Sequence, residues 1–124
     1  MSRIEQTIPL AAPADTLRSL IADSAMHSAF TGAPADIGAE PGSTWTAFGG
    51  KIEGRTLDSS PTQLVQAWRS ADWPDGVYSL VTFQFADGTI RLVHDAVPDG
   101  AKDMLEQGWH QMYWEPMKAW LAAR

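Results

Sequence analysis

The sequence predicts an α+β protein in which an antiparallel sheet of about seven strands packs against a long C-terminal helix. Helical periodicity is confined to the two ends of the 124-residue chain. The segment from residue 35 to residue 98 instead consists of short strand-like runs separated by turn signals. Apolar and polar side chains alternate in the clearest of these runs, which is typical of a sheet with one buried face and one wet face.

The N-terminal part is predicted to form one strand followed by two short helices. Residues 3–10 have strand-like content. Pro13 suits the first position of a helix, where its missing N–H is not needed, and three apolar residues from Leu17 onward recur at helical spacing. A second short helix is predicted over residues 25–30, because the turn sequence of residues 31–34 stops it.

Six further strands are predicted in the middle of the chain. The Gly49-Gly50 and Asp87-Gly88 pairs are the strongest hairpin signals, because their residues tolerate positive φ. Hairpins join neighbouring strands in antiparallel pairs. The predicted strands cover residues 35–39, 43–48, 51–59, 63–70, 77–86 and 89–97.

Strand phase predicts which side chains face the interior. The three apolar residues at alternate positions of 81–85 share one face of their strand. Across the next turn, Ile90, Leu92 and His94 share one face as well. His94 therefore points toward the apolar side, where an imidazole needs a hydrogen-bond partner.

Residues 101–123 are predicted to form a helix that covers the apolar face of the sheet. Its stripe of seven large side chains would contribute on the order of 10–20 kcal/mol as an upper bound. Pro116 lacks an N–H and is expected to bend the helix near Met112. Trp114 projects away from the stripe at 100° per residue, so it either packs under the first helices or stays exposed. The stripe consists of Leu105, Trp109, Met112, Tyr113, Pro116, Met117 and Trp120.

Composition and motifs limit the classes of partner and site that the chain can have. With 15 acidic and 9 basic residues the net charge is -6, which disfavours binding to nucleic acid. The absence of cysteine excludes disulfides, thiolate zinc sites and cysteine nucleophiles. His27, His94 and His110 lack metal-ligand spacing, and no phosphate loop or other cofactor motif is present. No signal peptide and no run of about 18 apolar residues is visible, so one cytoplasmic domain over residues 1–124 is expected.

Several short motifs occur together in the chain. They are His27-x-x-Phe30-Thr31-Gly32-Ala33-Pro34-Ala35, Phe48-Gly49-Gly50-x-Ile52-x-Gly54, Leu64-Val65-Gln66-x-Trp68-Arg69, Trp73-Pro74-x-Gly76-x-Tyr78-Ser79, and Gly108-Trp109 with Tyr113-Trp114-Glu115-Pro116. In these motifs the chain resembles proteins related to the C-terminal domain of the activator of Hsp90 ATPase, over nearly its whole length from residue 27. The resemblance implies a START-like (Bet v 1-like) helix-grip fold, in which the C-terminal helix lies in the concave side of a curved sheet.

Three functions are compatible with this resemblance. The first is a non-enzymatic binding protein with an apolar cavity between the C-terminal helix and the sheet, for a hydrophobic or aromatic small molecule. The second is a co-chaperone-like interaction module with a filled interior, which would bind an Hsp90-type chaperone through exposed Trp73 and Trp114. The third is a cyclase-type or hydrolase-type enzyme with His94 and Tyr113 as acid and base. The predicted cavity wall is Phe30, Trp45, Trp68, Phe83, Leu92, His94, Trp109, Met112 and Tyr113.

Each candidate residue also has a purely structural interpretation. His94 is then a core histidine that hydrogen-bonds to the backbone or to Tyr113, and His27 is structural too. Arg69 stacks on an aromatic ring or holds a neighbouring carboxylate. The aromatic residues either fill the core or leave a cavity, with the small residues Gly54, Ala67 and Gly108 as the places where space is expected.

Overall fold

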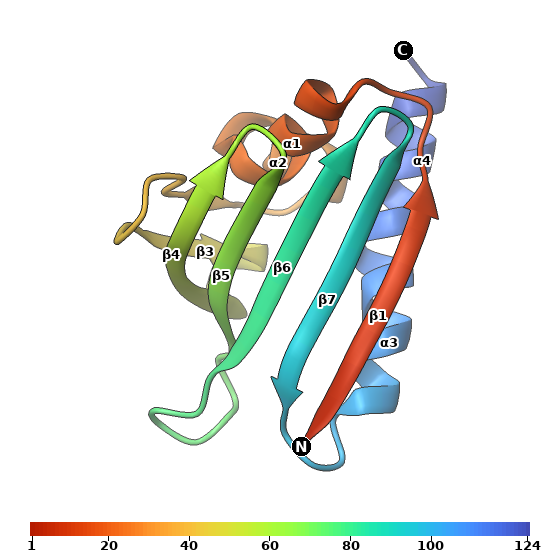
Figure 1. Cartoon of the computed structure of the whole chain (residues 1–124). Coiled ribbons are helices and arrows are strands. Elements are labelled where there is room, and N and C mark those ends of the chain that lie inside the picture. Colours follow the sequence, from red (N-terminus) through yellow and green to blue (C-terminus); the bar gives the residue numbers. More distant parts are fainter.

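Seven antiparallel strands form one curved sheet in the computed structural model, which describes all of residues 1–124 (Figure 1). The strands are β1 (Ser2–Pro9), β2 (Asp36–Ile37), β3 (Thr44–Ala47), β4 (Ile52–Ser60), β5 (Gln63–Ser70), β6 (Ser79–Ala86) and β7 (Thr89–Val97). Their order in the sheet is β1-β7-β6-β5-β4-β3-β2. The first strand therefore pairs with the last, and the remaining strands follow one another as a meander.

The helices lie behind the sheet in Figure 1. Two short ones, α1 (Ala14–Ala22) and α2 (Ser24–Thr31), follow β1 as predicted. Pro13 is the N-cap of α1 rather than its first residue. The carboxylate of Asp23 caps α2 by accepting a hydrogen bond from the Met26 N–H at 3.0 Å.

The C-terminal helix runs behind β7 and β1 and contains an irregular turn (Figure 1). It consists of α3 (Lys102–Trp109), the π-helical segment η2 (His110–Trp114) and α4 (Glu115–Ala122). In η2 the N–H of Glu115 bonds to the carbonyl of His110, five residues back. Pro116 has no N–H for the carbonyl of Met112, so the regular pattern is broken where the bend was predicted.

The π-helical segment corrects two predictions that assumed 100° per residue. A π-helical turn contains more residues than an α-helical turn, so the residues before and after it face different directions from those that 100° per residue predicts. Trp114 was expected to project away from the apolar stripe and either to pack under the first helices or to stay exposed; it is buried, and its ring stacks on Trp109 of the stripe with the centroids 5.7 Å apart. Met112, which was expected on the buried stripe, is 48% exposed.

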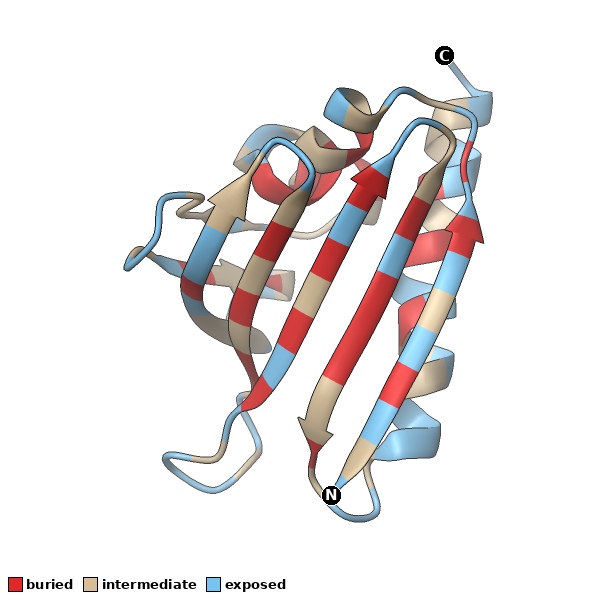
Figure 2. Ribbon diagram, viewed as in Figure 1, coloured by how far each residue is buried: buried red, intermediate tan, exposed pale blue.

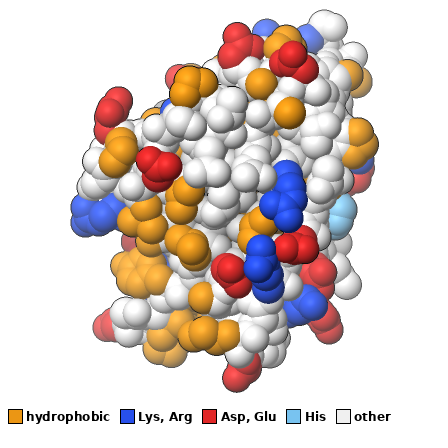
Figure 3. Space-filling model, in the orientation of Figure 1, with side chains coloured by type: hydrophobic (Ala, Val, Ile, Leu, Met, Phe, Trp, Pro, Cys, Tyr) orange, Lys and Arg blue, Asp and Glu red, His pale blue; other side chains and the backbone are white.

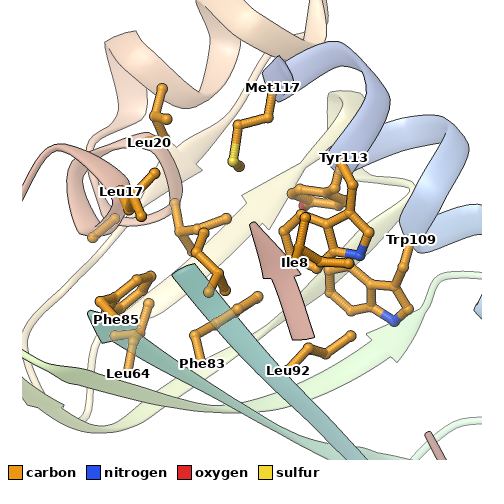
Figure 4. Close-up of a cluster of buried hydrophobic side chains, with 14 of the residues drawn as sticks. Ile8, Leu17, Leu20, Leu64, Phe83, Phe85, Leu92, Trp109, Tyr113 and Met117 are labelled. Atoms are coloured by element: carbon orange, nitrogen blue, oxygen red, sulfur yellow. The ribbon is translucent and has the colours of Figure 1, made fainter. Parts of the chain in front are cut away.

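The core lies between the inner face of the sheet and the helices. The inward side chains of residues 81–85 and of Ile90, Leu92 and His94 are buried, which confirms the predicted strand phases (Figure 2). Leu17 and Leu20 from α1 reach the same cluster of side chains (Figure 4). The sheet face that points away from the helices carries no second layer.

Three predicted boundaries differ from the structure. The strand expected over residues 35–39 is reduced to the two residues of β2. The Gly49-Gly50 hairpin is the 3-10 turn η1 (Phe48–Gly50), in which all three residues have positive φ. Strand β6 begins at Ser79 rather than at Val77. No helix in the chain is both long enough and apolar enough to cross a membrane.

Candidate functional site

The nine predicted wall residues divide into two groups. Three of them, Trp109, Met112 and Tyr113, border a groove at the surface. The other six lie in the filled core, and none of them borders that groove. These six are Phe30, Trp45, Trp68, Phe83, Leu92 and His94.

Trp109 is the centre of the aromatic packing between helix and sheet. Its ring centroid lies 4.8 Å from that of Tyr113 and 5.7 Å from that of Trp114. On the sheet side, the centroids of Phe83 and Trp68 are 5.8 Å and 6.2 Å away. These distances are those of rings in direct contact, so the space predicted for a ligand is occupied by side chains here.

His94 is fully buried, and both of its ring nitrogens are hydrogen-bonded. The indole N–H of Trp109 can only donate, so His94 Nδ1 accepts from it at 3.1 Å. Nε2 then carries the proton and donates to the Ser79 hydroxyl at 2.7 Å, which in turn donates to the Trp68 carbonyl at 3.0 Å. Burial lowers the pKa of His94 to about 4. The core histidine is confirmed, but its partners are Trp109 and Ser79 rather than the backbone or Tyr113.

The hydroxyl of Tyr113 pairs with His27 instead. His27 Nδ1 donates to the Ile21 carbonyl at 2.9 Å, and Nε2 accepts from the Tyr113 hydroxyl at 3.0 Å. Burial lowers the pKa of His27 and raises that of Tyr113, so both groups are neutral at pH 7. The acid–base pair of His94 and Tyr113 that a cavity enzyme would need is not assembled, because each side chain is bonded to another protein group.

No space remains for a side chain at Gly54. The Trp45 indole N–H donates to the Ala67 carbonyl at 3.2 Å across this residue. A Cβ atom at Gly54 would lie 1.8 Å from the same carbonyl oxygen and 2.9 Å from Trp45 Nε1. The absence of a side chain at Gly54 thus allows the close approach of Trp45 and strand β5.

The surface groove lies between the C-terminal helix and the segment that joins β3 to β4. It has a volume of about 210 Å³, and six of its eight lining residues are apolar. Lys51 is its one charged residue and forms no ion pair. The lining residues are Phe48, Lys51, Ile52, Leu105, Gly108, Trp109, Met112 and Tyr113.

One wall of the groove is held by unusual backbone geometry. Phe48 has φ 53°, a left-handed conformation that is rare for bulky residues, and Gly49 and Gly50 after it are left-handed as well. This conformation places the Phe48 ring edge-on to Tyr113, with the centroids 5.6 Å apart. Phe48 was predicted as the last residue of an ordinary strand over residues 43–48, so its role in the groove was missed. The Phe48-Gly49-Gly50 motif nevertheless marks the position of the turn.

The remaining candidates are structural. Trp114 is buried and donates to the side-chain oxygen of Gln6 at 2.7 Å. Trp73 is partly buried against Trp68, with ring centroids 5.5 Å apart, so neither tryptophan is an exposed anchor. Arg69 holds the Glu53 carboxylate at 2.6 Å, as one interpretation predicted. No group of three or more metal-ligating side chains occurs.

Comparison with known proteins agrees with this architecture. A profile of the family described as activator of Hsp90 ATPase homolog 1-like protein matches residues 11–122. An uncharacterised Schizosaccharomyces pombe protein is 30% identical over 120 residues, which are 93% of this chain and 36% of that protein. The human activator of 90 kDa heat shock protein ATPase homolog 1 is 32% identical over 95 residues, 73% of this chain and 28% of its own. The chain thus spans no more than 36% of the length of these two relatives.

Solved structures share the fold. The HSP90 activator from Plasmodium falciparum has a TM-score of 0.92 at 22% identity, with 98% of this chain and 97% of the other covered. A Mesorhizobium loti protein has a TM-score of 0.82 at 18% identity, with 98% of both chains covered. At such identities the likeness establishes a common helix-grip architecture.

Proposed function

Because the chain belongs to the activator of Hsp90 ATPase homolog 1-like family, we propose that it is a protein-interaction module that binds an Hsp90-type chaperone. Two relatives are named for an action on this ATPase, the human protein and the one from Plasmodium falciparum. Both the co-chaperone function and the ligand-binding function were compatible with the sequence. The filled interior favours the co-chaperone function.

The observation that carries this proposal is the contrast between interior and surface. Inside, the Trp109 indole contacts the ring of Tyr113 and donates a hydrogen bond to His94, while the Tyr113 hydroxyl is bonded to His27. Outside, Met112 leaves a half-exposed thioether beside an open apolar groove. Methionine side chains adapt to partners of different shape and are frequent at interaction surfaces. The groove therefore suits a bulky apolar side chain of a partner, with an acidic neighbour placed against Lys51.

Titration of the isotope-labelled chain with a purified Hsp90-type chaperone tests this function. We expect NMR signals of the groove residues to shift or broaden, and the chaperone ATPase rate to change in parallel. Met112→Lys is expected to weaken binding at least about tenfold, because it places a charge in an apolar contact. Met104→Lys is the matched control, since Met104 is exposed on α3 but does not line the groove. Absence of binding, or equal losses in both variants, would contradict the proposal.

A second candidate function is the binding of a small apolar molecule in the same groove. The apolar lining and the unpaired Lys51 favour a compact hydrophobic or aromatic body with one anionic group. The volume of about 210 Å³ is below the roughly 300–1,000 Å³ of drug-sized sites, so the ligand would be small or only partly enclosed. Native mass spectrometry of freshly purified protein tests this function directly. A bound mass that is lost in Lys51→Met supports it, and an unliganded mass with no thermal shift across a panel of aromatic acids counts against it.

A further inference from the structure

The surface groove contains one methionine, and an irregular turn of helix holds its thioether in water. Met112 is 48% exposed and lines the groove together with Trp109 and Tyr113. At 100° per residue Met112 would lie on the buried stripe, whereas the π-helical segment η2 turns it outward and buries Trp114 instead. The helix thus exposes an oxidisable side chain at the place where the partner is proposed to bind.

Methionine is the residue type through which this chain undergoes reversible two-electron oxidation, because the chain contains five methionines and no cysteine. Hydrogen peroxide transfers one oxygen atom to the thioether. The sulfur lone pair attacks one peroxide oxygen, the S–O bond forms as the O–O bond breaks, and the departing hydroxide takes up a proton to give water. Sulfur loses two electrons and the peroxide gains them. Methionine sulfoxide reductase reverses the step with a dithiol, which becomes a disulfide while the oxygen leaves as water.

The other four methionines lie outside the groove. Met26 and Met117 pack in or against the core, and Met117 is 0% exposed, so peroxide in the solvent does not reach it in the folded chain. Met1 and Met104 are more exposed than Met112 but do not line the groove. No strand contains a methionine, so the sheet face seen in Figure 3, with its hydrophobic side chains in orange, is not altered. Oxidation therefore changes the groove through Met112 alone.

A sulfoxide at Met112 alters the groove in two ways. Its S–O group is strongly polar, so an apolar side chain of a partner packs against it only at the cost of dehydrating it. The sulfoxide oxygen is also a hydrogen-bond acceptor, and Lys51 in the same groove has no ion-pair partner within the chain. An oxidised Met112 thus competes with an acidic group of the partner for the Lys51 ammonium.

We propose that Met112 is a reversible oxidation site, and that its conversion to the sulfoxide by a peroxide releases the chaperone from the groove. This inference rests on the proposed function and adds a means of regulating it. The fold itself survives the oxidation, because Met117 within the core stays reduced. The reductase then restores the thioether and, with it, the binding surface.

Peptide mass spectrometry of the folded chain after graded exposure to hydrogen peroxide tests the modification without any chaperone. We expect one added oxygen at Met104 and at Met112 but none at Met117, and circular dichroism should show an unchanged fold. Methionine sulfoxide reductase should then remove the oxygen from Met112. A Met112 that stays reduced while Met104 is oxidised would overturn the proposal, and so would a Met112 sulfoxide that resists the reductase.

Titration of a purified Hsp90-type chaperone with the chain before and after oxidation tests the effect on binding. The peroxide is removed before the chaperone is added. The wild type is expected to lose affinity at least about tenfold on oxidation and to recover it after treatment with the reductase. Met104→Leu should show the same loss, because Met104 lies outside the groove. Met112→Leu is compared with its own untreated sample, and peroxide should leave its affinity as it was.

The outcomes separate this proposal from the proposed function. A reduced chain that binds the chaperone, and binds it equally well as the Met112 sulfoxide, overturns the regulation and leaves the function standing. A reduced chain that does not bind overturns the function and the regulation together. A loss of affinity on oxidation that persists in Met112→Leu but is absent in Met104→Leu would also overturn the regulation, since a different thioether would then be responsible.

Discussion

The indole Nε1–H of Trp109 donates a hydrogen bond to Nδ1 of His94 across 3.1 Å, and this bond joins the C-terminal helix to strand β7 inside the core. It also fixes the tautomer of His94, because the proton must then lie on Nε2, opposite Ser79. A second proton on the ring would have to occupy Nδ1, where it would face the Trp109 donor. The bond therefore requires a neutral histidine.

Acid is expected to destabilise the protein through His94. Burial lowers its pKa from 6.5 in the unfolded chain to about 4 in the folded one. Between these two values the unfolded state binds the extra proton, so the free energy of unfolding falls as the pH decreases from 6.5 toward 4 and is independent of this group above that range. At about 1.4 kcal/mol for each pH unit, the loss from His94 is about 3 kcal/mol. Urea unfolding at pH 7 and at pH 4.5 measures it.

Two variants separate His94 from the other titrating groups. His94→Gln is expected to be less stable at pH 7 but to lose less stability on acidification. His110→Gln, which alters an exposed histidine, is the control substitution. The lowered pKa of His27 adds a loss in the same direction, so some pH dependence remains in His94→Gln. An unchanged slope in His94→Gln would contradict the assignment.

Tyr113→Phe is expected to destabilise the protein by about 1–3 kcal/mol. The substitution removes the hydroxyl that donates to His27 Nε2 at 3.0 Å and leaves a buried acceptor without a partner. Tyr78→Phe is the matched control, because Tyr78 is half exposed and its loss of a hydroxyl should change stability by less than about 0.5 kcal/mol. Urea unfolding of the three proteins at pH 7 gives both differences. Equal values for the two variants would show that the bond to His27 contributes nothing.

Gly54→Ala is expected to destabilise the chain by more than about 3 kcal/mol or to prevent folding. The added Cβ atom would meet the Ala67 carbonyl oxygen at 1.8 Å, a backbone atom that cannot move without breaking the β4–β5 ladder. The Trp45 indole at 2.9 Å would be displaced as well. Thermal unfolding by circular dichroism measures the effect, and a wild-type melting temperature would contradict the close approach of these strands.

Local sequence patterns were sufficient to predict the strands, the helices and much of the core. Strand phase placed His94 and Leu92 inward, because a period of two depends only on neighbouring residues. The Asp87-Gly88 turn fixed the β6–β7 hairpin for the same reason, and Gly88 has the positive φ expected of it. The family motifs then supplied the helix-grip architecture, which no local pattern contains.

The groove could not be predicted in this way. The 100° rule assumes a regular helix, and the π-helical segment before Pro116 exchanges the exposure of Met112 and Trp114. The left-handed Phe48 is a backbone state that few non-glycine residues adopt, so a propensity argument assigns it to a strand. Ser79 was missed as the partner of His94 because the two residues meet only through the pairing of β6 with β7.

Gly108→Ala is expected to stabilise the fold and weaken chaperone binding at the same time. Gly108 lies inside α3, where alanine is favoured over glycine by about 0.5–1 kcal/mol, and a Cβ atom there would have no other atom within 4 Å. The new methyl group would instead enter the groove that Gly108 lines. Urea unfolding should therefore show a gain in stability, while titration with the chaperone shows a loss of affinity. A variant that is stabilised and binds as the wild type does would place the contact outside the groove, because the fold would be intact and only the groove would have changed.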